Sequence, residues 1–282
     1  MALPPGTIVA ANPGFDGQNI GLFAVNPANG QVTTVAQGGM FVVPWNVVFL
    51  ADGRLLVADA TAFGTGGLIA VDPDSGQQTK VSSSSLFLQP YGLALAADGQ
   101  VVVTYTDRPG QARGVVMRVN PANGEHRAVS LDFRFDFPFA VALDAAGNAI
   151  VTDPNDAFSG DPNRLIRIDI GQGAKIRADS PGFVFTGVAV EPTGNLVVTS
   201  DPTAGTGNQK LVRFHPTSGP PTVLSQADKI RAPQAVTVEA NGAILVADRT
   251  GAILRVDPNT GAQSTVTTSG LLRNMHGIAV RR

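Results

Sequence analysis

Three aspartates at one repeated position are the residues of this chain best suited to metal chemistry. Asp59, Asp153 and Asp248 each end a strand-like run (RLLVAD, NAIVTD and AILVAD). Calcium takes about six to eight oxygen ligands and magnesium also prefers oxygen, so these carboxylates, with Asn46 and backbone carbonyls, predict a calcium or magnesium site. The alternative is that each aspartate caps its own loop by accepting backbone N–H groups. Recurrence at a repeat position favours this structural role.

A single histidine, His276, could provide general-base chemistry. Imidazole titrates near neutral pH, and His276 directly precedes the strand-like run GIAV (277–280). At the mouth of a binding site it could take a proton from a substrate. The alternative is a hydrogen-bonded structural histidine close to the point where the chain closes on itself.

Aromatic and amide side chains share the position of His276 in the other repeats. Counting eight residues back from a recurring turn glycine gives five candidate ligand-binding residues: Trp45, Tyr91, Phe139, Thr186 and Gln234. Asn46, next to Trp45, joins them. Rings with a few polar groups are typical of small-molecule pockets. A second ring ends the following strand and adds Tyr105, beside Ala11, Ser200 and the three aspartates. Such divergence on a repeated scaffold indicates a specific site, although unselected drift produces the same pattern.

The elements that position these residues repeat six times. A turn glycine recurs every 46 to 48 residues, at Gly6, Gly53, Gly99, Gly147, Gly194 and Gly242. A second turn, mostly of the form Pro-x-x-Gly, recurs at Gly30, Gly76, Gly124, Gly173, Gly219 and Gly261. Glycine suits tight hairpins because it takes positive φ without penalty. Runs rich in Val, Ile and Leu lie between these turns, so each repeat predicts four short strands, which is the pattern of a propeller blade.

The two ends of the chain predict how the ring closes. TIVAA (7–11) matches the second strand of a blade and GIAV matches a first strand. Joining them completes a blade and hides the sheet edges that an open array would expose. We therefore predict an all-β fold, a six-bladed β-propeller of four-stranded blades forming one domain (1–282), with the sixth blade closed by strands from both termini.

The long connections are predicted to share one rim of the propeller. They follow the second and fourth strands of the repeats, as in 59–67 and 36–45, whereas the other connections are tight turns. Long loops on a rigid scaffold commonly carry function. We therefore place the function on this long-loop face and at the mouth of the central channel.

Two other recurring sets have structural explanations. Four arginines occur at one position of the third strand and predict pairing with a neighbouring blade: Arg118, Arg167, Arg213 and Arg255. Loop phenylalanines could line an apolar pocket or fill gaps between blades, and the second role is favoured. They are Phe133, Phe135, Phe137 and Phe139 of LDFRFDFPF, and Phe41, Phe87, Phe183 and Phe185 in the equivalent loops of other blades.

Composition limits the partners of the protein. Hydrophobic residues make up 43% of the 282 residues and charged residues 15%, with a net charge of −2, so a folded chain is expected. Without a Lys/Arg cluster, neither nucleic acid nor an anionic membrane is an expected partner. The chain has no cysteine and no long apolar run. It also lacks a nucleophile elbow, a P-loop and a dinucleotide fingerprint.

The repeats resemble those of NHL-repeat propellers across almost the whole chain. The resemblance is carried by QPYGLALAADGQVVVTY, APQAVTVEANGAILVAD and NMHGIAV. It implies a propeller fold, and it covers both enzymes and binding modules. Similar repeats in secreted bacterial proteins imply a secreted or periplasmic protein. A signal peptide is absent from this sequence, which begins MALPPGTIVA.

Two enzyme families are distantly similar. Similarity to gluconolactonase- and regucalcin-like propellers implies a calcium site at the channel mouth, with Asn46 and Asp153 in the roles of its Asn and Asp. Similarity of NMHGIAV to virginiamycin B lyases implies His276 as the base, with magnesium nearby.

The favoured interpretation is a binding module that uses the long-loop face and the channel mouth for a small molecule or a protein partner. The alternatives are a calcium- or magnesium-dependent hydrolase or lactonase, and a lyase that uses His276. A binding module predicts apolar side chains at the mouth, whereas a hydrolase predicts carboxylates that converge on one ion.

Overall fold

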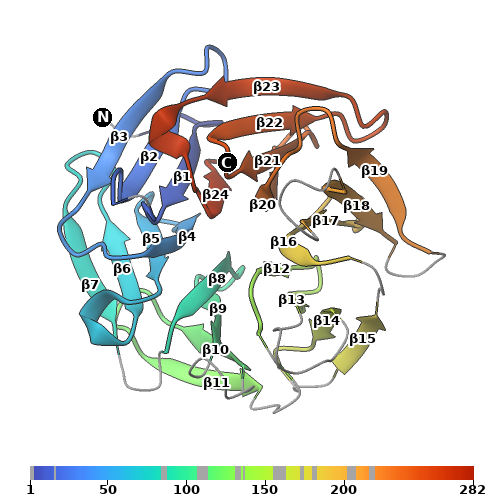
Figure 1. The fold of residues 1–282 in the computed structure, drawn as a ribbon. Coiled ribbons are helices and arrows are strands. Elements are labelled where there is room, and N and C mark those ends of the chain that lie inside the picture. Colours follow the sequence, from blue (N-terminus) through green and yellow to red (C-terminus); the bar gives the residue numbers. More distant parts are fainter. Residues whose placement is uncertain are drawn as a thin grey trace.

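The computed structural model describes residues 3–15, 17–83, 88–106, 114–130, 135, 137–154, 163–171, 175–179, 183–201, 208–215 and 220–282. Figure 1 shows six four-stranded antiparallel sheets arranged as blades around a central axis. The predicted six-bladed β-propeller is therefore confirmed. Among the described residues, no helix is long and apolar enough to cross a membrane.

Blade 1 contains both ends of the chain, and blades 2 and 3 follow it. Blade 1 consists of β24 (Gly277–Val280), β1 (Ile8–Asn12), β2 (Gly21–Val25) and β3 (Val32–Gln37). Blade 2 consists of β4 (Pro44–Phe49), β5 (Leu55–Asp59), β6 (Gly67–Val71) and β7 (Gln78–Ser82). Blade 3 consists of β8 (Pro90–Leu95), β9 (Val101–Thr106), β10 (Gly114–Val119) and β11 (His126–Ser130).

Blades 4 to 6 complete the ring. Blade 4 consists of β12 (Val141–Leu143), β13 (Ala149–Asp153), β14 (Arg164–Ile168) and β15 (Lys175–Asp179). Blade 5 consists of β16 (Phe185–Val190), β17 (Leu196–Ser200), β18 (Lys210–Phe214) and β19 (Thr222–Gln226). Blade 6 consists of β20 (Pro233–Val238), β21 (Ile244–Asp248), β22 (Ala252–Val256) and β23 (Gln263–Thr268). Two short 3₁₀ helices, η1 (Ala62–Gly64) and η2 (Gly270–Leu272), lie in loops.

The closing blade forms as the sequence predicts. β24, from the end of the chain, pairs antiparallel with β1 from its beginning, with Ile8 opposite Val280 and Ala11 opposite Gly277. Around the channel, the first strands β24, β4, β8, β12, β16 and β20 contact one another in that order and close into a ring.

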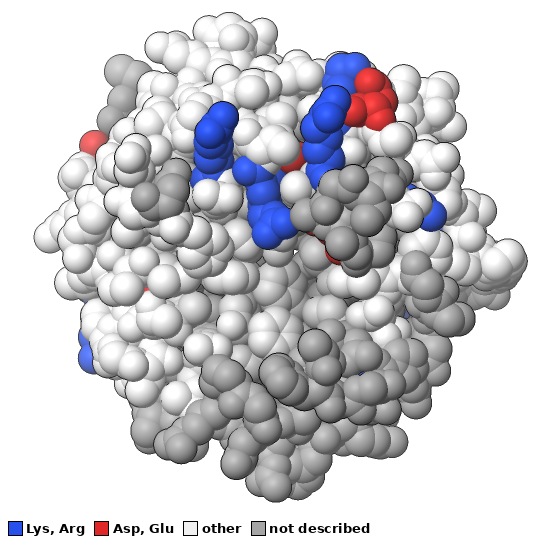
Figure 2. Space-filling view, viewed as in Figure 1, with Lys and Arg blue, Asp and Glu red and all other residues white. Residues whose placement is uncertain are grey.

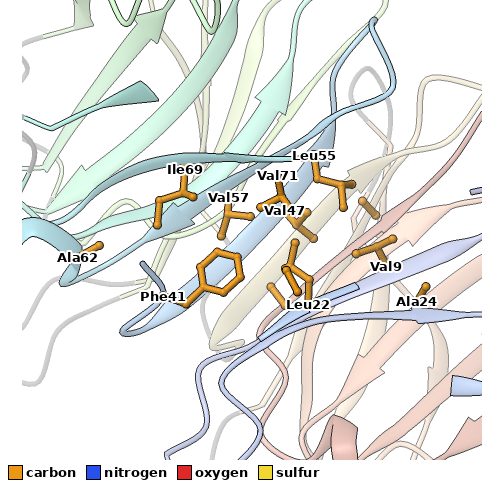
Figure 3. Close-up of a cluster of buried hydrophobic side chains, with 13 residues drawn as sticks. Val9, Leu22, Ala24, Phe41, Val47, Leu55, Val57, Ala62, Ile69 and Val71 are labelled. Carbon is orange, nitrogen blue, oxygen red and sulfur yellow. The ribbon is translucent and has the colours of Figure 1, made fainter. Parts of the chain in front are cut away.

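Burial explains why the strands have these sequences. Every residue of the second strands β1, β5, β13 and β21 is buried, because other blades cover both faces of these strands. The outer strands β3 and β23 instead contain exposed residues. Figure 3 shows one interblade core, in which Val9 and Leu22 of blade 1 pack with Val57 and Ile69 of blade 2.

Phenylalanines from the loops also enter these cores. Phe41, Phe135 and Phe185 are each buried in a hydrophobic cluster. The predicted gap-filling role is therefore confirmed for these three. Phe139 instead lines the central channel and Phe137 packs beside it, as the pocket alternative predicts, and Phe87 and Phe133 lie outside the described residues.

Two glycines let neighbouring first strands approach closely beside the channel. Gly277 directly follows His276, and a Cβ placed there would lie 2.6 Å from the Cα of Asn46. The same position in blade 5 is Gly187, where a Cβ would lie 2.9 Å from the Cα of Ala235. Contacts this short with backbone leave no space for a side chain, so the interblade spacing depends on these glycines.

The recurring arginines form ion pairs, but within their own blades. Arg213 binds Glu191 through two hydrogen bonds of 2.7 and 2.5 Å, and Arg255 binds Glu239 in the same way at 2.7 and 2.9 Å. Each acid lies in the tight turn after the first strand of the same blade. The prediction of a partner in a neighbouring blade was therefore wrong for these ion pairs. Arg213 also reaches the next blade, where it donates to the carbonyl of Pro258 at 2.7 Å.

Candidate functional site at the channel mouth

The central channel is a ligand-sized cavity that begins at the predicted mouth residues. Its volume is about 620 Å³. Its wall consists of the six first strands, and its ends are marked by Trp45 and His276 on the long-loop face and by Asp52 and Arg282 on the tight-turn face. Of the six mouth residues predicted from the sequence, five line this cavity: Trp45, Phe139, Thr186, Gln234 and His276. Asn46 also lines it.

Backbone irregularities set the direction of several mouth side chains. The pairing of the first two strands shifts register between Pro44 and Asn46 in blade 2, and between Pro233 and Ala235 in blade 6. Trp45 and Gln234 are therefore the extra residues of β-bulges. A bulge bends a strand locally and re-aims a side chain. Here it occurs where the first strand reaches the mouth.

Trp45 lies at the centre of an aromatic cluster. Its ring centroid is 4.2 Å from that of His276, 4.8 Å from that of Tyr91 and 5.8 Å from that of Phe139. Phe15, from the loop after β1, contacts both Trp45 at 5.7 Å and His276 at 5.2 Å. Edge-to-face contacts at these distances are favourable for aromatic rings. The mouth is therefore bordered by rings from blades 1 to 4.

Two polar groups at the mouth have no protein partner among the described residues. The indole Nε1–H of Trp45 is buried without an acceptor. The side chain of Gln234 is 7% exposed and its amide forms no hydrogen bond to a described residue. An unpaired buried donor such as the Trp45 N–H costs about 1 to 3 kcal/mol of stability, so the presence of Trp45 at this position calls for a functional explanation. A ligand with an acceptor group would offset this cost.

His276 is a neutral imidazole inside this cluster. It is 5% exposed, and its Nδ1 lies 2.7 Å from the carbonyl oxygen of Asn274. This contact assigns the proton to Nδ1 and leaves Nε2 as an acceptor. Burial lowers the pKa of His276 from 6.5 to about 4; the Asn274 hydrogen bond opposes this shift and the charge of Arg249 adds to it.

The depressed pKa of His276 predicts that acid destabilises the fold. Between pH 6.5 and about 4, the unfolded chain binds a proton at this position and the folded chain does not. The free energy of unfolding should therefore fall as the pH is lowered through this window, by about 3 kcal/mol in total. Urea unfolding of wild type and His276→Gln at stepped pH tests this. The variant should lose this part of the pH dependence, and equal slopes in both proteins would contradict it.

Asp59 and Asp248 hold loops in place. Asp59 accepts the backbone N–H groups of Val42, Val43, Thr61 and Ala62 at 2.8 to 3.1 Å. Asp248 accepts those of Arg231, Ala232 and Thr250 at 2.8 to 3.0 Å. Each carboxylate thus joins the loop before the first strand of its blade to the loop after the second strand. The loop-capping alternative is confirmed for both.

Asp153 and Asn12 complete the second ring in a related way. Asp153 accepts the N–H of Phe137 at 2.6 Å and pairs with the buried Arg164 at 2.5 Å. The first-blade member is Asn12 rather than the expected Ala11, because Asn12 ends β1 as Asp59 ends β5. Its Nδ2 donates to the carbonyl of Leu271 at 2.8 Å, and its Oδ1 accepts the N–H of Gly14.

The structure does not gather the predicted metal ligands. Asp59, Asp153 and Asp248 belong to alternate blades, and none of them lines the channel that Asn46 lines. The Oδ1 of Asn46 accepts the neighbouring N–H of Val47 at 2.7 Å. Within the described ranges, no group of three or more His, Asp or Glu residues is placed to hold a metal ion. A calcium or magnesium site formed by these residues therefore remains a sequence-based prediction.

The remaining predicted residues differ in their surroundings. Thr186 has a structural role, because its Oγ1 donates a hydrogen bond to the carbonyl of Pro233 in the next blade at 2.9 Å. Tyr91 belongs to the aromatic cluster, where its hydroxyl lies 3.0 Å from the Gln89 side-chain oxygen. Tyr105 is fully buried in the core between blades 2 and 3. Tyr105 therefore lies apart from the channel lining.

Sequence reasoning missed two residues beside His276. Phe15 is 57% exposed and covers the edge of the aromatic cluster. Arg249 directly follows the second-ring residue Asp248, and its Nη2 lies 3.6 Å from a carboxylate oxygen of Asp201. The sequence signal for Arg249 was its place next to the second ring. No repeat position marks Phe15.

Comparisons with known proteins support the fold alone. No protein-family model and no curated protein matches the sequence. Among solved structures, the propeller of a nidogen–laminin complex is 15% identical with a TM-score of 0.78, covering 99% of both chains. A protein assigned to the gluconolactonases is 17% identical with a TM-score of 0.68, covering 96% of this chain and 89% of its own. Virginiamycin B lyase from Staphylococcus aureus is 17% identical with a TM-score of 0.61, covering 92% and 84%.

Proposed function

We propose that this propeller is a binding module that holds a ring-bearing or otherwise apolar ligand group at the long-loop end of its channel. The observation that carries the proposal is the cluster around Trp45, in which aromatic rings surround a buried indole N–H that lacks an acceptor. Apolar walls with a few unpaired polar groups are the usual make-up of a small-molecule site. Trp45, Tyr91, Phe139 and His276 would contact the ligand, and Gln234 would hydrogen-bond to it.

The surroundings of His276 support binding over catalysis. A general base works best when its pKa lies near the working pH, and burial holds the pKa of His276 at about 4. Neutral His276 is therefore a weak base at neutral pH, but its Nε2 remains a good hydrogen-bond acceptor. Among the described residues, no observation specifically supports a lyase reaction through His276 or a metal-dependent lactonase. The predicted secreted or periplasmic location remains part of the proposal.

The only tryptophan of the chain is the mouth residue Trp45, so intrinsic fluorescence reports directly on this site. Titration with small ring compounds (phenol, benzoate and cyclohexanol) should change the Trp45 emission in a saturable way for at least one of them. Gln234→Leu should weaken that binding about tenfold, because it removes a hydrogen-bonding amide while keeping the side-chain bulk. The matched control is Asn241→Leu, in a tight turn on the opposite rim.

Two outcomes would contradict the binding proposal. One is the lack of any saturable change in Trp45 emission with all three compounds. The other is a rise in Tm when calcium or magnesium is added to EDTA-treated protein, if Asp153→Ala abolishes it. A ligand that binds only the folded state raises its stability by mass action. The second result would therefore favour the metal-dependent hydrolase.

A further inference from the structure

Blades 2 and 6 present their long loops on the same backbone framework. In blade 2, Asp59 accepts the N–H of Val42, three residues before the mouth residue Trp45. In blade 6, Asp248 accepts the N–H of Arg231, three residues before the mouth residue Gln234. Both bonds are 2.8 Å long. The carboxylate therefore fixes the equivalent loop position in each blade.

A glutamine fixes a second point of each loop. The Oε1 of Gln78 accepts the N–H of Met40 at 2.6 Å, and the Oε1 of Gln263 accepts the N–H of Lys229 at 2.9 Å. Met40 and Lys229 both lie five residues before their mouth residues. Two attachment points per loop limit the conformations that a partner would have to order on binding, which favours affinity.

The blade 1 and blade 2 part of this framework exposes large apolar side chains, with the Lys80 ammonium 4.8 Å from the centre of the Phe63 ring. Among the described residues, five large hydrophobic side chains are exposed, and four of them lie on the long-loop face of these two blades: Phe15 (57%), Met40 (37%), Val42 (48%) and Phe63 (39%). We call these four residues the apolar sector. Exposed apolar side chains gathered in one place indicate an interaction surface.

The loop positions of blade 6 that correspond to those of blade 2 carry positively charged side chains, as does the loop that leads into β24. Lys229 and Arg231 stand where blade 2 has Met40 and Val42, and Arg273 stands three residues before His276. Together with Arg249 they form the basic sector, and Figure 2 shows Lys and Arg side chains gathered in the upper part of the long-loop face. Lys229 pairs with Asp228 at 3.0 Å. Within the part of the chain that the structure describes, Arg231 and Arg273 form no ion pair.

The two sectors meet at the channel mouth. Phe15 of the apolar sector contacts His276 at 5.2 Å. The backbone carbonyl of Arg249, in the basic sector, accepts the N–H of Asn274 at 2.9 Å, and the charge of the Arg249 side chain acts on His276. A partner that lies across the mouth would therefore touch apolar side chains on one side and guanidinium groups on the other.

We propose that the long-loop face docks an acidic segment of a partner protein that also carries apolar side chains. The apolar residues of that segment would pack on the apolar sector, and its carboxylates would face Arg231, Arg249 and Arg273. Guanidinium groups bind carboxylates through paired hydrogen bonds, and complementary charge fixes the orientation of a docked segment. This inference rests on the proposed binding role of the long-loop face and adds the chemistry of the partner.

The test uses labelled synthetic peptides and fluorescence anisotropy. One peptide has a run of Asp and Glu followed by Leu and Phe, and its matched form has Lys in place of the acids. The acidic peptide should bind, more weakly as salt is raised, and the Lys form should not. The R231E/R273E double variant should weaken binding of the acidic peptide at least tenfold. The opposite-rim variant Arg54→Glu should leave it unchanged.

A second pair of variants tests the apolar sector. V42S/F63S should also weaken binding of the acidic peptide, without changing the salt dependence that the basic sector gives. Because Arg231, Arg273, Val42 and Phe63 are exposed, all variants should unfold near the wild-type Tm, which serves as the folding control.

Three results would overturn the partner assignment. They are no measurable binding of the acidic peptide, equal binding of the acidic and Lys forms, and unchanged binding by a folded R231E/R273E variant. Binding to phosphatidylserine vesicles in place of the peptide would also overturn it in favour of a membrane surface. If the peptide fails while the Trp45 response to ring compounds persists, only the partner assignment fails, and the small-ligand proposal stands.

Discussion

Replacing Asp59 with alanine is expected to lower the free energy of unfolding by about 4 kcal/mol. The carboxylate is fully buried and accepts four backbone N–H groups from two loops. Each buried donor left without an acceptor costs about 1 to 3 kcal/mol, and partial loop rearrangement should recover some of the total. Asp59→Asn keeps one acceptor oxygen and should lose about half as much. Equilibrium urea unfolding measures both.

The control for Asp59 is Asp52→Ala. Asp52 pairs with Arg54 on the tight-turn rim, and both side chains are well exposed, so its loss should cost less than about 1 kcal/mol. If Asp59→Ala were as mild as Asp52→Ala, the loop-holding role of Asp59 would be wrong. A large loss would also show that the second ring can be retained for structural reasons, without a bound ion.

The second large effect is expected at Gly277. A Cβ at this position would lie 2.6 Å from the Cα of Asn46 and 2.8 Å from the carbonyl oxygen of Trp45. Both atoms belong to the backbone of the neighbouring blade, so the first strands would have to separate. Gly277→Ala should therefore lower the free energy of unfolding by about 3 kcal/mol, as overpacking of a tight interior does.

The same substitution should disturb the mouth, because Gly277 directly follows His276 and its clash is with Trp45 and Asn46. We expect a shift in the Trp45 emission maximum of folded Gly277→Ala. The matched control is Gly270→Ala, where a new Cβ meets nothing within 4 Å, and it should change neither stability nor emission. Equal behaviour of the two variants would contradict the close-approach role of Gly277.

The sequence by itself determined the number of blades, their four strands and the closing pair β24–β1. These features depend on local signals, namely turn glycines at a regular spacing and strand runs of suitable length. The same count located five residues of the channel lining, because a repeat position fixes where a side chain lies along its blade. It could not show that Trp45 and Gln234 are bulged, since a bulge depends on the register of the paired strand.

Only the tertiary structure decided what the polar residues do. For Asp59 and Asp248 the repeat position favoured loop capping but left metal binding open. Only the structure shows their N–H partners, because these come from the loop before the first strand as well as from the loop after the second. The neutral state of His276 depends on its burial, and the rings of Trp45 and Phe15 that contact it come from the other end of the chain. The division of the long-loop face into apolar and basic sectors likewise exists only once the ring has closed, since it brings blades 6, 1 and 2 side by side.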